Sequence, residues 1–122
     1  MFAILFSFAG TFTACSSPDT GASCPSASAP TYAGFAAPFM AAYCTGCHSA
    51  SARDRFGAPP GLDFDTEDEV RAHAHAIGDD AAAGPSGEND DMPDLGGPVT
   101  RLPSHAERVM LGEYLACANS MQ

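Results

Sequence analysis

The chain has 122 residues and a formal net charge of −10, because ten aspartates and five glutamates outnumber five arginines and there is no lysine. This length supports one small domain and no more. Nucleic acids and anionic lipid headgroups both bind to basic protein surfaces, so the negative net charge excludes both as partners. An acidic surface is compatible with steering toward a basic protein partner, and solubility alone explains it at least as well.

The N-terminus has the pattern of a bacterial export signal. Residues 2–8 form a short apolar run that cannot span a bilayer, and Phe12-Thr13-Ala14-Cys15 follows it and resembles a lipobox. We therefore expect residues 1–14 to be a lipoprotein-type signal peptide and Cys15 to carry the lipid. No positive charge accompanies Met1, so the true start of translation stays open. The alternative is an apolar tail without function.

A tether is predicted to follow the signal. Residues 15–30 are rich in serine, alanine and proline and have no apolar periodicity. We expect the folded domain to span residues 31–122.

The first predicted helix runs over Thr31–Tyr43. Phe35 and Phe39 stand four residues apart, and Tyr43 follows at the same spacing, which places three aromatic rings on one helix face. Pro38 falls inside this stretch and gives a second possible start, because proline is tolerated in the first turn of a helix.

The five residues Cys44-Thr45-Gly46-Cys47-His48 form the attachment pattern of a c-type haem. Two cysteines in one turn can bond the two vinyl-derived carbons of a haem. The next residue is then carried under the ring, where an imidazole nitrogen can bind the iron. The alternatives are a dithiol redox motif, which needs a strand–helix–strand context that the sequence lacks, and a zinc site, which usually needs two paired motifs.

Two further cysteines are left once Cys15 is assigned to lipid and the paired cysteines to haem. Cys24 and Cys117 are an even remainder in an exported chain, where disulfides persist. We expect a bond between them, and the alternative is two free thiols.

Two more helices are predicted beyond the haem motif, over Glu67–Ile77 and His105–Ala118, and each begins at a capping-box pattern. Gly78 is the expected stop of the first. The second carries an apolar stripe of Leu111, Tyr114, Leu115 and Ala118. No strand pattern of useful length is present, so the fold class is predicted to be all-α, with about three helices and long loops.

The loops over Ser49–Asp65 and Asp79–Pro103 separate these helices. The second is too long for a mere connection, and such loops are usually functional or disordered. It contains Asp91-Met92-Pro93.

Together these motifs resemble a class I cytochrome c, and in particular the small haem domains of exported bacterial lipoproteins. The resemblance covers Thr31–Ala118 and includes a Pro60-Gly61-Leu62 turn, a late Met92-Pro93 pair and an aromatic C-terminal helix. It implies a cytochrome c-like fold wrapped around one covalently attached haem c, in which Phe39 meets Tyr114 or Leu115 where the first and last helices cross.

The resemblance also implies roles for single residues. Cys44 and Cys47 would hold the haem, and His48 would bind the iron. The Pro60 carbonyl would receive the other ring N–H of that histidine, with Leu62 in the same haem-binding turn.

Four more residues are candidates around the haem. Met92 is the expected sixth ligand, and its rival is His73 on the inner face of the second helix, which would give a bis-histidine iron. Arg53 and Arg55 would bind the haem propionates, although surface salt bridges explain both arginines nearly as well.

The function implied is that of a monohaem electron carrier and not of an enzyme. We expect a monomer at the periplasmic face of a bacterial membrane, anchored through lipid on Cys15, which meets a redox partner with a basic docking surface. One alternative is a five-coordinate or bis-histidine haem protein that acts as a peroxidase or gas sensor. Another is a haemless surface lipoprotein whose dithiol is incidental.

Overall fold

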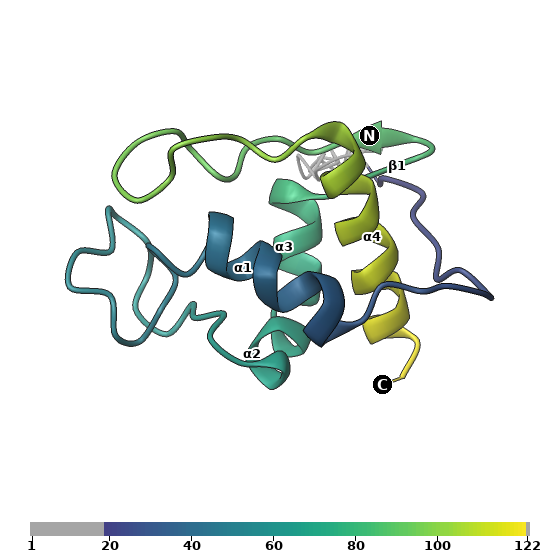
Figure 1. The fold of residues 1–122 in the computed structure, drawn as a ribbon, viewed down its shortest axis with the longest axis horizontal. Coiled ribbons are helices and arrows are strands. Elements are labelled where there is room, and N and C mark those ends of the chain that lie inside the picture. Colours follow the sequence, from purple (N-terminus) through teal and green to yellow (C-terminus); the bar gives the residue numbers. More distant parts are fainter. Residues whose placement is uncertain (1–18, 122) are drawn as a thin grey trace, which may run out of the picture.

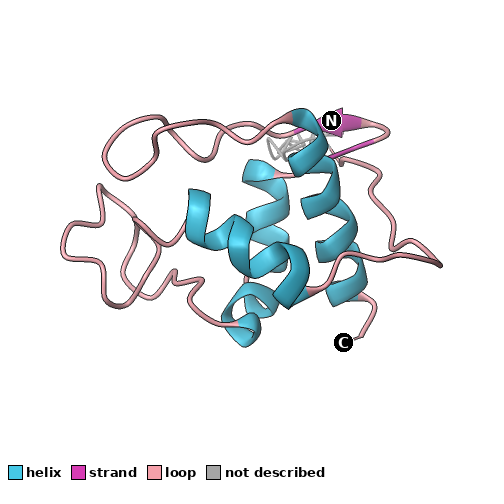
Figure 2. Cartoon of the chain, in the orientation of Figure 1, coloured by secondary structure: helices cyan, strands magenta, loops and turns pink. Residues whose placement is uncertain are grey.

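Short helices and long loops make up the domain in the computed structural model, which describes residues 19–121 (Figures 1 and 2). Within that range the chain forms four α-helices, one π-helical turn and a two-stranded sheet. The expectation of a mostly helical domain is therefore confirmed. The expected signal peptide and the expected lipid site at Cys15 lie outside the described residues.

The first helical segment begins as the π-helical turn η1 (Tyr32–Ala36) and continues as α1 (Ala37–Tyr43). Thr31 caps it, because its Oγ1 accepts a hydrogen bond from the Gly34 N–H at 3.0 Å. Pro38 stands in the first turn of α1. Proline has no backbone N–H to donate to a carbonyl of the preceding turn. This preceding turn is η1, which is π-helical.

The helix predicted over Glu67–Ile77 is instead two helices, α2 (Glu67–Ala72) and α3 (Ala74–Ala81). Its expected capping box is present at the start of α2. His73 breaks the segment with φ −108° and ψ 15°.

The prediction that Gly78 ends this segment is wrong, because α3 continues to Ala81. The amide of Asn89 donates to the Gly78 carbonyl at 3.0 Å, and the Met92 N–H donates to the Asp80 carbonyl at 2.8 Å. The last carbonyls of α3 are therefore bonded by a later loop, so the helix needs no glycine cap.

The last helix, α4, spans His105–Asn119 and begins at the expected capping box of Ser104 and Glu107. The Tyr43 hydroxyl donates to the Glu107 carboxylate at 2.9 Å, and Arg101 bonds the same carboxylate and lies over the Tyr43 ring. The end of α1 is thereby joined to the start of α4.

A small hairpin of β1 (Ala83–Gly84) and β2 (Gly87–Glu88) lies at the edge of the domain. β1 packs closely against α4. A side chain at Gly112 would place its Cβ 2.3 Å from the Ala83 carbonyl oxygen, so only glycine permits this approach.

The core is formed mainly by buried residues of α1, α3 and α4. Phe39, Tyr114 and Leu115 belong to this one cluster, as does Phe64 from the loop before α2. Two loops, residues 49–66 and 89–104, project from the same end of the domain (Figure 1). None of the helices in the described part of the chain has the length and apolar character needed to span a bilayer.

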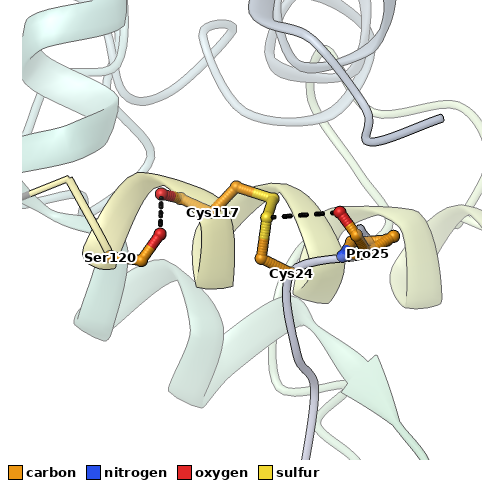
Figure 3. Close-up of a disulfide and its surroundings, with 4 residues drawn as sticks. All are labelled: Cys24, Pro25, Cys117 and Ser120. Carbon is orange, nitrogen blue, oxygen red and sulfur yellow. Dashed lines mark hydrogen bonds between the residues drawn. A yellow bond between two sulfur atoms is a disulfide. The ribbon is translucent and has the colours of Figure 1, made fainter. Parts of the chain in front are cut away.

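The expected disulfide between Cys24 and Cys117 is present, with 4.6 Å between the two Cα atoms (Figure 3). It fastens the segment before η1 to α4, on the side of the domain away from the two projecting loops (Figure 1). The Thr20 carbonyl also accepts a bond from the Ser86 N–H in the hairpin turn, at 2.9 Å.

Candidate functional site

A cavity of about 510 Å³ lies between the two projecting loops and the side of α3. Pockets for small molecules and cofactors have volumes of roughly 300–1,000 Å³. The lining brings together, from distant parts of the chain, Cys44, Cys47, His48, Arg55, Leu62, Phe64, Ile77, Asp80 and Met92.

The Cys44–His48 motif forms a single turn at the end of α1. The Cys44 N–H donates to the Met40 carbonyl at 2.8 Å and so continues the helix. The N–H groups of Cys47 and His48 then both bond the Cys44 carbonyl, at 3.1 and 2.8 Å. Both thiols and the imidazole line the same cavity, as the spacing of the motif predicts.

Gly46, inside the motif, is where the second loop packs against the first. A Cβ at this position would lie 2.4 Å from Cγ of Pro98. The absence of a side chain therefore lets the loop that follows Met92 close over the motif.

One ring nitrogen of His48 is fixed by the backbone. Nδ1 lies 3.0 Å from the Leu62 carbonyl oxygen. A carbonyl only accepts hydrogen bonds, so Nδ1 carries the proton in this pair, and Nε2 of the neutral imidazole keeps its lone pair for a metal.

The predicted carbonyl was that of Pro60, and this prediction is wrong. The Leu62 N–H bonds the Pro59 carbonyl at 3.2 Å, which closes a turn with Pro60 and Gly61 at its exposed tip. Leu62 is the residue that re-enters the domain beside His48.

Phe64 fixes the plane of the imidazole and was not identified from the sequence. Its ring stacks on that of His48 with 4.7 Å between centroids and 25° between planes. The Phe64 N–H also donates to the His48 carbonyl at 2.9 Å.

His73, the rival ligand, is not brought into the cavity. Its ring meets Phe64 edge-on at 5.9 Å, and it is absent from the cavity lining.

Met92 lines the cavity from the second loop. The residue is 41% exposed, and the Met92–Pro93 peptide bond is cis. Both polar groups of its backbone are hydrogen-bonded. The Met92 N–H donates to the Asp80 carbonyl, and the Met92 carbonyl accepts a bond from Arg108, each at 2.8 Å.

Arg108 was not identified from the sequence either, although it is 2% exposed. A signal was present: Arg108, Leu111 and Leu115 share the spacing of one helix face, so a charged residue occupies the apolar stripe of α4.

The two arginines expected at the propionates have different surroundings. All five N–H groups of Arg55 are engaged by the Asp63 carboxylate and by four carbonyls of residues 49–62, so it organises the loop and keeps no spare donor for a propionate. One of those carbonyls is that of Leu62. Arg53 is exposed and does not line the cavity.

Burial controls the ionisation of two groups in the cavity wall. It raises the pKa of the Cys44 thiol to about 12, and the neighbouring Cys47 adds to this rise while Arg108 opposes it. It also raises the pKa of Asp80, helped by the negative charges of Asp91 and Asp79.

Among residues 19–121, no group of three or more histidine, cysteine or acidic side chains is arranged to hold a metal ion by itself. The arrangement instead offers two sulfurs for covalent attachment, one imidazole and one thioether. In comparisons with known proteins, no family model, no curated protein and no solved structure matches the chain.

Proposed function

We propose that the protein is a monohaem c-type cytochrome with a cytochrome c-like fold, which carries one electron at a time. The observation that carries this proposal is the cavity that Cys44, Cys47 and His48 share with Met92. One segment supplies covalent attachment and a proximal ligand, and a distant loop supplies a soft thioether. Histidine with methionine is the axial pair of cytochromes c.

The residues of the cavity fit a haem in their chemistry. Cys44 and Cys47 would hold it through thioether bonds, and His48 and Met92 would bind its iron. A bound haem supplies the one-electron chemistry, and the protein supplies orientation and shelter from water. The Leu62 carbonyl holds the tautomer that leaves Nε2 for the iron.

Other uses of the cysteine pair are less compatible with its surroundings. Dithiol redox sites work through a lowered thiol pKa, whereas burial raises the pKa of Cys44 to about 12. A structural zinc site needs four ligands, and the described residues contain no such group. A thioether bond to haem needs no thiolate in the folded protein.

The setting proposed for this carrier is the periplasmic face of a bacterial membrane. The disulfide between Cys24 and Cys117 suits an oxidising compartment. The net charge of −10 suits a redox partner with a basic docking surface. Anchoring through lipid on Cys15 belongs to the same proposal.

The test is haem staining after denaturing electrophoresis of protein made together with haem-attachment machinery. We expect colour on the wild-type chain and none on the C44A/C47A variant, because only thioether bonds survive denaturation. The matched control is C24S/C117S, which removes the same number of sulfurs elsewhere and should keep its colour. An unstained wild-type chain contradicts the proposal.

A further inference from the structure

One arginine of α4 is buried in the face that the helix turns toward the core. Arg108 is 2% exposed and precedes Leu111, itself fully buried, by one turn. A buried guanidinium is costly unless its N–H groups are hydrogen-bonded. Its partners therefore indicate which part of the fold requires it.

A single terminal nitrogen of Arg108 contacts three backbone carbonyls. Nη1 donates to Ala81 at 2.8 Å, to Met92 at 2.8 Å and to Asn89 at 3.1 Å. The Glu88 carboxylate lies farther away, 3.7 Å from Nε. Arg108 thus joins α4 to the last residue of α3 and to the loop that carries Met92.

These bonds fix Met92 through its backbone. Its N–H bonds the Asp80 carbonyl at 2.8 Å while its own carbonyl is held by Arg108, so two helices hold one loop residue. Met92 lines the cavity, and the residue is 41% exposed. Side-chain packing alone therefore holds it loosely, and the backbone bonds fix the position from which the side chain reaches into the cavity.

We infer that Arg108 is a positioning residue that keeps Met92 on the haem iron. It thereby decides whether the sixth coordination position of the iron is occupied by Met92 or open to external ligands. This inference rests on the proposed function. Arg108 acts on Met92 through backbone carbonyls, that of Met92 itself among them. An external ligand binds the fraction of molecules in which Met92 has left the iron, so its apparent affinity measures that fraction.

The test is a titration of the full-length ferric holoprotein with imidazole, which competes for the sixth position. We expect R108Q to bind imidazole at least about tenfold more tightly than wild type, because charge-assisted bonds to the loop are lost. The far-red charge-transfer band of methionine-bound ferric haem should weaken in parallel. R108K keeps a shorter cationic donor, so we expect a smaller gain of about threefold.

Val70→Ala is the matched control for a general loss of stability. Val70 is fully buried in α2 and does not line the cavity. This variant should unfold more readily than wild type and yet keep imidazole affinity within about twofold and an unchanged far-red band.

The outcomes separate the inference from the proposed function. The order wild type, R108K, R108Q in imidazole affinity supports the inference, and R108K alone decides it if R108Q does not fold. Wild-type affinity and band in folded R108K overturn the inference, and so does an equal gain in V70A. A wild-type chain without covalent haem overturns the proposed function together with the inference.

Discussion

His48 and Met92 face the cavity under different restraints. His48 is fixed by the hydrogen bond of its ring to Leu62 and by the stacked ring of Phe64. Met92 is fixed through its backbone, and the residue is part-exposed. If the proposed function holds, loss of the methionine side chain should change the ligation of the haem iron and spare the fold.

Met92→Ala is expected to keep covalent haem and to lose the far-red band, because the thioether is removed while both cysteines remain. Cyanide should then bind the ferric protein rapidly. The matched control is Met110→Ala, since Met110 is equally exposed at 41% but lies on α4 outside the cavity. Retention of the band in Met92→Ala would contradict the assignment of Met92. Rapid cyanide binding by the wild type would favour the open-iron alternative.

The features of this site that could be predicted from the sequence are those that depend only on residues close together in the chain. The spacing of Cys44, Cys47 and His48 determines their shared turn, because one turn of chain is local geometry. The Leu62 carbonyl and the Phe64 ring depend on how a separate loop folds back, so neighbouring residues do not encode them. Arg108 acts on a loop that precedes its helix, and its only local signal is a charge within an apolar stripe.

At the scale of elements, helix starts are better determined by sequence than helix ends. Ser104 with Glu107 forms the expected capping box of α4, as does the matching pair at α2, because such caps need only residues three apart. The end of α3 depends on hydrogen bonds from Asn89 and Met92 of the next loop, so the prediction that the helix ends at Gly78 was wrong.

The cap of α4 predicts how stability responds to acid. Hydrogen bonds from Arg101, followed by those from the Ser104 backbone and Tyr43, lower the pKa of Glu107 from 4.5 to about 2. A carboxylate with a lowered pKa stabilises the folded state above its unfolded pKa, and this contribution is lost as the pH falls through the folded value.

Glu107→Gln is therefore expected to lower the free energy of unfolding at neutral pH and to lose less stability than wild type between about pH 5 and pH 2. Urea unfolding followed by helical circular dichroism at several pH values measures both effects. Glu113→Gln, which removes one carboxylate from the same helix away from the cap, is the matched control. Identical acid profiles for Glu107→Gln and wild type would show that the cap does not retain its charge.

At the scale of the whole molecule, the domain has its disulfide at one end and its cavity at the other. The disulfide ties the start of the described chain to α4, and the two long loops form the cavity walls at the opposite end (Figure 1). The helical character and the disulfide could be predicted from periodicity and cysteine number. The hairpin could not, because its two-residue strands are too short to show a pattern.

The C24S/C117S variant should be less stable by at most about 5 kcal/mol, because the bond closes a loop with a sequence separation of 93 residues and so restricts the unfolded chain. Urea unfolding of the oxidised wild type and the variant measures the difference. The far-red band should be unchanged, since the bond lies at the far end from the cavity. Equal stability of the two proteins would show that the crosslink does not restrain the unfolded chain.

The most direct measurement is a reduced-minus-oxidised absorption spectrum of the purified full chain, made in cells that attach haem to cysteine pairs. The account predicts the sharp bands of a six-coordinate c-type haem that appear on reduction and disappear on reoxidation. A folded, disulfide-bonded preparation that is colourless in both states would contradict it.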